Sequence, residues 1–561
     1  MLSTFALLIL LTLPSPSLPL NIPPPPPSPP RVLVIGGGVG GLATAARLQK
    51  SGASCTILEK QDKLGGRVGE YTHRGHRWET GASLLLLPDI YKETLEAVDG
   101  EPIEVRRVDP AYSVFFDGHA DRGPVVLGGS SAALKARLDM EAPDAFEKFE
   151  EYGECAREYL RAGWPIFIEE DLSLKSLLTL PRFLLNALAG PWRWPLFSHD
   201  RQLRRLFPES PRMRALCSFD DLYVGLTPQE APAVFSLLAA IELDGSETPG
   251  APRPDAGVFY PVGGFGTFLS SLERAAIASG VAIRTGVEVT QVLTSNGSAV
   301  GVRCANGDSL LADHVVVNAD LSTAEPKLLS ESPGASRQDY TEKQFSTSSI
   351  TFLWALDSNE TLAGLTHHNV FLAESSSEAA GDDPFKVAWS DQLPRKSSAG
   401  DFPDNGFHFY CCAPSRTDET AAPEGRDTLM VLVPTPPLGE AGEGGSDDVD
   451  GWIEKARAAV LERLEKAGGC GDVWPHVVHE RVIDPREWRD SLGLRRGSVF
   501  GLSHGLDQLA IFRPSRKSRR VDNLFFVGAS TRPGNGVPLV LTSARLLSEE
   551  IVKVMSNNEA K

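Results

Sequence analysis

The spacing of hydrophobic residues changes twice near the start of the chain. Val32–Ile35 is an unbroken run of four aliphatic residues, which is typical of a fully buried parallel strand. Leu42–Lys50 then places Ala and Leu on one face, as an amphipathic helix does. Cys55–Leu58 is a second buried run. A strand, a helix and a strand in this order predict a βαβ unit of an α/β fold with a parallel sheet.

Later segments return to this pattern after a region that lacks it. Residues 90–255 show acidic amphipathic stretches and no βαβ rhythm, so we expect them to be helical. A predicted helix at Phe268–Ser279 and buried runs at Val281–Arg284, His314–Val317 and Leu524–Val527 are expected to rejoin the first sheet. A second, mixed sheet is predicted from strand-like runs at Ile350–Leu356, Asn369–Leu372, Gly406–Cys412 and Thr428–Pro434.

The chain has 561 residues, too many for one ordinary core, and intertwined domains are expected. The polar stretches Glu374–Asn405 and Gly439–Gly451 predict loops, and Trp452–Lys466 predicts a helix. The expected divisions are a leader or membrane-dipping segment at 1–20, a Pro-rich linker at 21–30, nucleotide-binding parts at 31–89, 256–330 and 491–555, a helical substrate region at 90–255, and a substrate sheet with insert loops at 331–490.

The first residues suggest targeting. Phe5–Leu13 is an apolar run of nine residues, too short to span a bilayer and suited to a signal-peptide core. No Lys or Arg precedes it. A cleaved signal or organelle leader, an uncleaved anchor and an artefact of the gene model therefore all stay open. Pro23–Pro30 is a polyproline linker to the folded body.

Charge and cysteine content narrow the classes of function. The formal net charge is −18, with 55 basic and 73 acidic residues, which argues against nucleic acid as a partner. Seven cysteines are scattered without a CxxC pair. Neither a disulfide framework nor a zinc site is indicated, and no metal ligands are assigned.

A glycine motif between the first strand and helix carries the first chemical signal. Gly36-x-Gly38-x-x-Gly41 offers a tight turn, close backbone approach to a pyrophosphate and close helix packing. Glu59 follows Gly41 by 18 residues, where a carboxylate accepts hydrogen bonds from a ribose. The alternative is a Gly-rich turn that binds no nucleotide. The motif alone does not choose between NAD and FAD.

Two further loops bear on that choice. Lys60 follows Glu59, and Gly65-Gly66-Arg67 supplies two glycines and a guanidinium for the second side of a pyrophosphate. Near the other end, the small-residue loop Gly528–Gly536 leads into Val537-Pro538, with Pro at a favoured helix start. The dipole of such a helix stabilises anionic charge on a reduced flavin ring.

Leu172–Phe207 combines Leu and Phe with Trp192 and Trp194. Arginines flank this segment at Arg182, Arg193, Arg201, Arg204 and Arg205. An interfacial membrane contact and an ordinary core with a basic rim account for this composition equally well.

From Arg31 to Ile551 the chain resembles the carotenoid desaturases of the phytoene desaturase family, and is most similar to the single-enzyme, multi-step type, within the FAD-dependent amine-oxidase-like flavoproteins. The motifs that carry the resemblance are Leu222-Tyr223-Val224-Gly225 with Glu230-Ala231-Pro232-Ala233, Val258–Gly264, Pro414–Asp418 with Ala421–Gly425, Phe500–His504 with Phe512-Arg513-Pro514, and the closing VGAST-x-PG-x-GVP. The family commonly has His where this chain has Arg532.

The resemblance implies a glutathione-reductase-like (Rossmann) FAD-binding domain, an interleaved mixed α+β substrate domain and a helical, membrane-contacting subdomain. It implies that FAD is held at the ADP half by Gly36, Gly38, Gly41, Glu59 and Lys60, at the pyrophosphate by Gly65, Gly66 and Arg67, at the adenine by Val289, and at the flavin by Gly528, Ala529, Gly536 and Val537.

The chemistry implied is desaturation of phytoene or a related carotenoid in carotenoid biosynthesis. Hydride moves to the flavin, a neighbouring carbon loses a proton, and a quinone or oxygen accepts the electrons. The substrate needs an apolar tunnel, and its home in lipid favours a membrane-associated enzyme of an endomembrane or organelle, plastids included. No general base is assigned: His504, Glu230, Arg416 and Asp418 are polar motif residues for which structural hydrogen bonds are the simpler interpretation.

Other functions stay open on the same fold. One is a carotenoid cis–trans isomerase or a retinol-saturase-like enzyme, and a second is a non-catalytic prenyl- or lipid-binding protein without flavin. An amine oxidase is a weaker alternative, because the closing motif fits desaturases better.

Overall fold

The structure is a computed structural model of the chain. It describes residues 29–117, 120–165, 190–244, 253–330, 340–375, 383–393, 402–404, 406–439 and 447–559. The leader at 1–20 and most of the linker at 21–30 lie outside the described residues, as does the part of Leu172–Phe207 that precedes Gly190.

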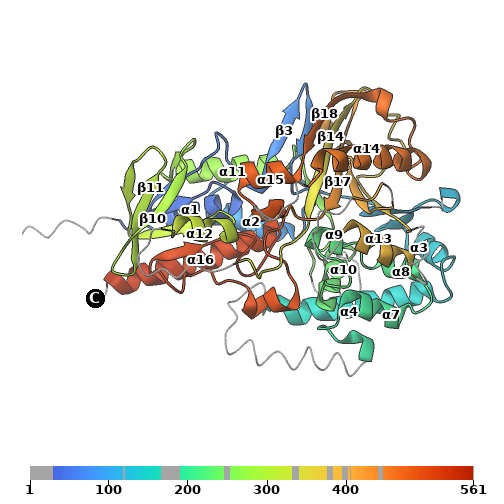
Figure 1. The fold of residues 1–561 in the computed structure, drawn as a ribbon, viewed down its shortest axis with the longest axis horizontal. Coiled ribbons are helices and arrows are strands. Elements are labelled where there is room, and N and C mark those ends of the chain that lie inside the picture. The colour runs from blue at the N-terminus through green and yellow to red at the C-terminus, as the bar shows by residue number, and fades with distance from the viewer. Residues whose placement is uncertain are drawn as a thin grey trace, which may run out of the picture.

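A five-stranded parallel sheet forms the nucleotide-binding half, seen on the left of Figure 1. Its order is β19 (Leu524–Phe526), β13 (His314–Val317), β1 (Arg31–Ile35), β2 (Ser54–Leu58) and β9 (Ala282–Arg284). Every segment predicted to rejoin this sheet does so. These runs are aliphatic because both faces of the sheet are covered, one by helices and the other mainly by a small antiparallel sheet, and neither face meets solvent.

Helices from three distant parts of the chain pack on one another in this half. α1 (Val39–Lys50) lies against both α11 (Phe265–Ala278) and α16 (Val537–Glu559). Ala43, Ala45 and Ala46 are fully buried, and these small side chains let the helices approach closely. β10 (Val289–Ser295), β11 (Ser298–Cys304) and β12 (Ser309–Leu311) form an antiparallel sheet beside them.

The structure differs from the expected divisions at residues 90–255. α2 (Pro88–Ala97) crosses the expected boundary and packs against α16, burying Tyr91 and Leu95 in the nucleotide-binding core. Three strands also lie in the region expected to be helical, namely β5 (Val105–Arg107), β6 (Tyr112–Phe116) and β7 (Val125–Leu127). They are too short to show a periodicity, and β5 and β6 each pair with a strand that lies far away in the sequence.

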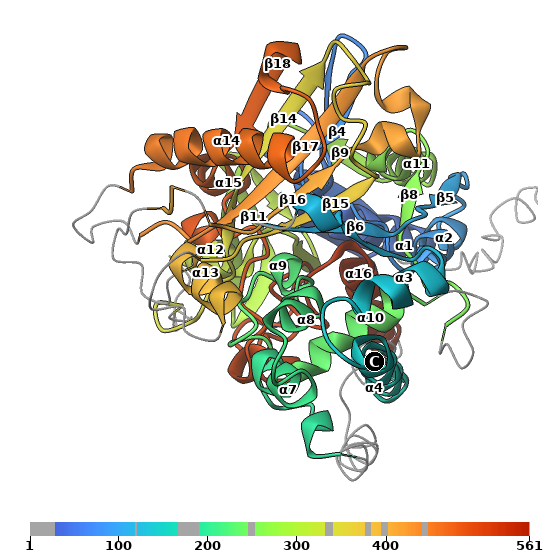
Figure 2. The same cartoon turned by 90° about the vertical axis from the view of Figure 1, so that its right-hand side faces the viewer.

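The second sheet has seven strands in the order β18 (Val477–Ile483), β14 (Ser348–Leu356), β17 (Asp427–Thr435), β16 (Phe409–Cys412), β15 (His368–Leu372), β6 and β7. The pair β15–β6 is parallel and the others are antiparallel, as predicted for a mixed sheet. Figure 2 shows the strands between α14 (Val449–Lys466) on one side and a group of short helices on the other.

The helical subdomain below this sheet contains α3 (Ser131–Leu138), α4 (Ala145–Trp164), α7 (His199–Leu206), α8 (Pro211–Leu216), α9 (Asp221–Val224) and α10 (Leu237–Glu242). The remaining elements are the hairpin β3 (Glu70–His73) and β4 (His76–Glu79), strand β8 (Phe259–Pro261) paired with β5, and helices α12 (Leu321–Leu328), α13 (Pro384–Gln392) and α15 (Pro485–Leu492). Among the described helices, none has both the length and the apolar character needed to cross a membrane.

α13 lies inside the stretch Glu374–Asn405 that was predicted to be a loop, so that prediction is wrong over this helix. Asp383 caps its N-terminus by accepting a hydrogen bond from the Lys386 N–H at 3.1 Å, and Pro384 occupies the first turn. A short capped helix carries little periodicity of its own.

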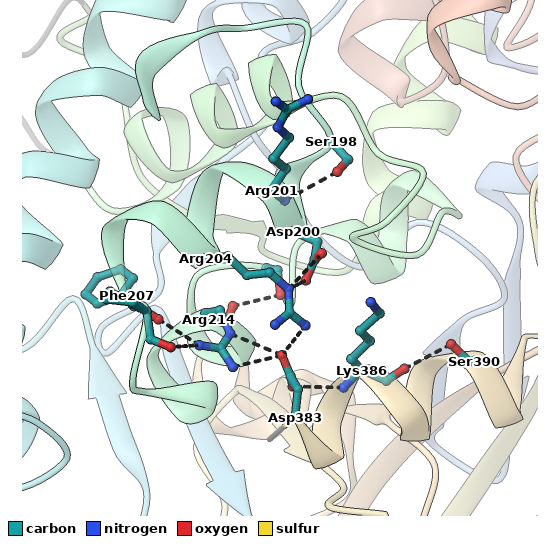
Figure 3. A network of polar contacts seen from close by, with 11 residues as sticks. Ser198, Asp200, Arg201, Arg204, Phe207, Arg214, Asp383, Lys386 and Ser390 are labelled. Carbon is teal, nitrogen blue, oxygen red and sulfur yellow. Dashed lines mark hydrogen bonds and ion pairs between the residues drawn. The ribbon is translucent and has the colours of Figure 1, made fainter. Parts of the chain in front are cut away.

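The same Asp383 joins α13 to α7 and α8 (Figure 3). Its Oδ2 accepts from Arg214 Nε at 3.1 Å and Nη2 at 2.9 Å, and from Arg204 Nη2 at 2.8 Å. Arg214 is only 5% exposed and also donates to the Phe207 carbonyl. Arg204 is one of the arginines at the segment Leu172–Phe207, and its side chain binds carboxylates within the protein.

Replacing Asp383 by Ala should strongly destabilise the protein, because the buried Arg214 charge loses its carboxylate. We expect a cost of about 3 kcal/mol and a clearly lower midpoint of thermal unfolding. Asp200→Ala is the matched control, since Asp200 bonds only the partly exposed Arg204 in this network. Equal losses in the two variants would contradict the role given to Asp383.

Candidate functional site

One cavity of about 1080 Å³ runs between the two halves of the molecule. All of the cofactor-binding residues expected from the sequence line it except Gly41. They come from both ends of the chain: Gly36, Gly38, Glu59, Lys60, Gly65, Gly66 and Arg67, then Val289, then Gly528, Ala529, Gly536 and Val537. The fold thus brings together residues separated by nearly the whole sequence.

The glycine turn is built without room for side chains. Gly36 has φ 99°, and a Cβ there would lie 2.6 Å from the Asn318 carbonyl oxygen. Gly38 is the N-cap residue of α1, and a Cβ on it would meet Asn318 Nδ2 at 2.9 Å. At Gly41 a Cβ would lie 2.2 Å from the Gly36 carbonyl oxygen, so Gly41 packs the helix on the turn instead of lining the cavity.

Glu59 is held by backbone N–H groups. Its Oε2 accepts from the Gly37 N–H at 2.6 Å and its Oε1 from the Gln61 N–H at 2.9 Å. The side chain is 9% exposed and faces the cavity. Each carboxylate oxygen has a second acceptor site, which suits a ribose hydroxyl. Val289 lies beyond it, where Val287 N–H donates to the Glu59 carbonyl at 2.8 Å.

The second loop joins the first directly. Gly65 N–H donates to the Gly37 carbonyl at 3.1 Å, and Gly65 has φ 118°. Arg67 Nη1 donates to the Val499 carbonyl at 3.0 Å. Desolvation lowers the pKa of Arg67 below its usual range, and Asp320 opposes this shift. An anionic group in the cavity would complete the partners of this guanidinium.

Sequence analysis did not assign the residues that hold the loop Gly528–Gly536. Arg513 is fully buried and donates to the carbonyls of Leu502 and Ser503 on one loop and of Ala529 and Thr531 on the other. Burial lowers the pKa of Arg513 to about 9. Arg513 belongs to the motif Phe512-Arg513-Pro514, but the sequence does not reveal that its guanidinium is buried and binds backbone carbonyls.

His504 belongs to the same clamp. Its Nε2 accepts from the Asn535 N–H at 3.2 Å. Burial, with a smaller contribution from Arg513, lowers the pKa of His504 well below its usual value, so the ring is neutral and able to accept. Together with Arg513 it aims the first turn of α16 at the cavity.

Asn318 and Asp320 line the site but were not predicted from the sequence. Asn318 Nδ2 donates to the Gly36 carbonyl at 3.2 Å, and Ser530 Oγ donates to Asp320 Oδ2 at 2.8 Å. Both residues line the cavity. Their place in the sequence could have indicated this role, because they follow a predicted strand, and ligands bind at the carboxyl ends of parallel strands.

The polar motif residues left without a role have structural ones. Asp418 accepts from Arg77 Nη2 at 2.6 Å and from the Gly263 N–H at 2.7 Å. Arg416 pairs with Asp427 at 2.8 Å, and Glu230 accepts from Thr227 Oγ1 at 3.1 Å. These residues, His504 and Arg532 are not among those that line the cavity. The simpler interpretation of structural hydrogen bonds therefore fits them.

Beyond the glycine loops the cavity becomes mainly apolar. Its walls there include Leu84, Leu86, Phe219, Leu222, Val370, Leu432 and Trp488. Two tyrosines at this end share one carboxyl group: Tyr112 Oη donates to Glu242 Oε2 at 2.9 Å and Tyr223 Oη to Oε1 at 2.5 Å. Burial raises the pKa of Glu242 well above its usual range, and the neighbouring Asp220 raises it further.

Comparison with known proteins agrees with this geometry. The sequence profile of the flavin-containing amine oxidoreductases matches residues 39–552. The chain belongs to this family. The match confirms the resemblance drawn from the motifs, and it makes the chain an FAD-dependent oxidoreductase. The alternative without flavin is thereby set aside.

Named relatives refine the position within the family. A phytoene desaturase of Phycomyces blakesleeanus is 34% identical over 530 residues, covering 93% of this chain and 85% of the relative. A zeta-carotene-forming phytoene desaturase of Myxococcus xanthus is also 34% identical, over 93% of this chain and 94% of the relative. Cyclohexylamine oxidase from Brevibacterium oxydans shares the fold, with a TM-score of 0.57 and 16% identity, over 93% of this chain and 99% of that structure.

The residues present fit FAD. The adenosine diphosphate half of FAD would meet the glycines Gly38 and Gly65, the Glu59 carboxylate and the Arg67 guanidinium. The flavin ring, which gains negative charge on reduction, would meet the positive end of the α16 dipole. Gly38 tests this fit well because its φ of −69° admits any residue, so a side chain there acts by filling space.

Gly38→Val should leave the protein folded but unable to retain flavin, because the new side chain enters the cradle beside Asn318. The flavin content per chain after gel filtration measures this. Gly471→Val is the matched control, since a Cβ at Gly471 meets no atom within 4 Å. A Gly38→Val protein that purifies with a full flavin complement would show that this turn does not bind the cofactor.

Proposed function

We propose that this chain is a carotenoid desaturase that acts on CH–CH groups and introduces C=C bonds into phytoene or a related carotenoid. The observation that carries the proposal is the continuation of the cofactor cavity into an apolar region walled by Phe219, Leu222 and Trp488. A hydrocarbon has no polar group to recognise, so a long apolar cavity is the means by which a protein can bind it. The substrate class is suggested by the similar proteins, which are phytoene desaturases.

The protein's own residues orient the substrate and exclude water in this proposal. The residues of the glycine loops would hold FAD, which would supply an acceptor for a hydride from one carbon of the substrate. The adjacent carbon releases a proton, and Tyr223 Oη lies at the apolar end of the cavity to receive it, with Glu242 buried behind the tyrosine as its hydrogen-bond partner. Glu242 accepts hydrogen bonds from both Tyr112 and Tyr223, so a proton taken up at Tyr223 Oη can pass to its carboxylate. Two electrons and two protons then leave to a quinone or to oxygen.

Expression in a phytoene-accumulating host tests the proposal. Desaturation lengthens the conjugated system, so extracts should gain carotenoids that absorb visible light. Glu242→Gln should retain flavin and lower the yield of coloured product at least about tenfold, as expected for loss of a proton acceptor. Glu230→Gln is the matched control, because Glu230 bonds Thr227 away from the cavity.

Unchanged phytoene in a host that makes the flavin-loaded protein would refute desaturation of phytoene. Incubating that protein with tetra-cis-lycopene then distinguishes the isomerase alternative, because isomerisation changes the spectrum without adding double bonds. Phytoene in liposomes with added FAD and a quinone gives the same answer for the purified protein.

The proposal includes a membrane-associated enzyme of an endomembrane or organelle, since a carotenoid resides in lipid. Leu506, Ile511 and Phe512 are exposed by 44%, 50% and 63%. Leu509 from this segment and Trp192 from the sequence-predicted membrane segment pack against the same buried cluster of Cys155 and Tyr159. The exposed apolar residues therefore adjoin that segment, which supports a common lipid-facing surface.

Ile511→Ser combined with Phe512→Ser should reduce flotation of the full chain with neutral lipid vesicles several-fold, because each change removes apolar area from the contact. Leu311→Ser serves as the control, since Leu311 is 58% exposed but lies on β12 in the nucleotide-binding half. Unchanged flotation of the double variant would place the lipid contact elsewhere.

A further inference from the structure

Three buried side chains with soft donor atoms meet where β15 and β16 pair. His368 begins β15 and lies directly opposite Cys412, the last residue of β16, and His367 precedes it. One ligand atom from each of the three lies within 4.8 Å of the others. The exposed fractions are 2% for His367 and 0% for His368 and Cys412. The cluster lies outside the residues that line the cofactor cavity.

Both imidazoles are fixed from their far side. His367 Nδ1 bonds Thr417 Oγ1 at 2.7 Å, and His368 Nδ1 bonds Tyr410 Oη at 2.6 Å. In each ring the Nε2 atom is buried and has no hydrogen-bond partner within the described part of the chain. When Nδ1–H donates to an oxygen, the Nε2 lone pair is left free, which is the usual arrangement of a histidine that binds a metal.

Two unpartnered Nε2 atoms at full burial need a physical explanation. Leaving a buried polar atom unpaired costs about 1–3 kcal/mol, so native structures rarely contain such atoms in pairs. A cation bonded to both nitrogens and to the adjacent thiolate removes both penalties at once. A histidine pair and a cysteine are the ligands that thiophilic metals prefer.

We propose that His367 Nε2, His368 Nε2 and Cys412 Sγ bind one thiophilic d¹⁰ metal ion, Cu⁺ or Zn²⁺. Three ligands and full burial favour Cu⁺, because one thiolate then neutralises the whole charge of the ion. Binding forms one metal–sulfur bond and releases the thiol proton to solvent. The site is independent of the reaction proposed for the cavity.

A metal here would stiffen one wall of the cavity. Tyr410 lines that cavity and bonds both His368 Nδ1 and Ser83 Oγ, the latter at 3.1 Å. The ion would therefore fix the tyrosine through the histidine ring. It would also tie β15 to β16 at the end where their ladder stops.

Metal analysis of the full-length, flavin-loaded protein tests the site. The protein is loaded anaerobically with Cu⁺, or separately with Zn²⁺, then dialysed and measured by mass spectrometry for metal per chain. We expect about one ion per chain in the wild type and at least a tenfold loss of affinity in Cys412→Ser. Cys411→Ser is the matched control: Cys411 is the neighbouring residue on the same strand, equally buried, but its side chain packs in the core on the other face.

X-ray absorption of the loaded wild type gives a result that needs no variant. The assignment predicts one sulfur and two nitrogens around the ion. In the zinc form we expect a Zn–S distance of about 2.3 Å and Zn–N distances of about 2.0 Å. The amount of each metal that stays bound after dialysis shows whether the site prefers Cu⁺ or Zn²⁺. Less than a tenth of an ion per chain after both loadings, or equal retention by Cys412→Ser and Cys411→Ser, would overturn the assignment. Since no carotenoid is present, failure of the desaturase proposal would not affect the result.

Discussion

The approach of Asn318 to the glycine turn is the contact on which the rest of the structure depends. Cβ atoms at Gly36, Gly38, Gly40 and Gly41 would each lie within 3 Å of Asn318 or of another atom of the turn. At Gly36 a Cβ would meet the Asn318 backbone, so only glycine at this position permits β13 to end this close to the start of α1, whereas at Gly38 a Cβ would meet the Asn318 side chain. That closeness brings the carboxyl ends of β1 and β13 to one edge, where phosphate-binding N–H groups and the residues after β13 face the same cavity.

From this edge the molecule extends in two chemically different directions. Toward β10, the cavity wall offers a carboxylate and backbone groups, which suit ribose and adenine. Toward the seven-stranded sheet it offers aliphatic and aromatic side chains, with the hydroxyl groups of Tyr112 and Tyr223 backed by buried Glu242. Arg513 binds two carbonyl oxygens of the loop 528–531, and Asp320 accepts a hydrogen bond from Ser530 of the same loop. The polar and apolar surfaces of the cavity therefore meet at one loop, which in the proposed function separates the cofactor from the hydrocarbon.

Local patterns predicted the parts of the structure that are local in origin. The strand–turn–helix at 32–50 and the glycine spacing needed only neighbours in sequence, and Glu59 followed from distance along the chain. Arg513 and Asn318 could not be assigned in this way, because their partners are backbone carbonyls supplied by other loops. β6 was missed for a similar reason, since its neighbour β15 lies more than two hundred residues away, and β7 has no partner in the sheet except β6. His367, His368 and Cys412 likewise form no motif along the chain, because it is the pairing of β15 with β16 that brings them together.

The position of β19 and α16 also has a consequence for synthesis of the protein. β19 pairs with β13 at one edge of the parallel sheet, and α16 covers α1, yet both come from the last forty residues of the chain. While the ribosome still holds those residues, β13 has an unpaired edge, and α1 lacks its contact with α16. The first domain thus stays incomplete until α16 has left the ribosome. The cofactor cannot be enclosed before then, because Val537 and the loop before it complete the cavity.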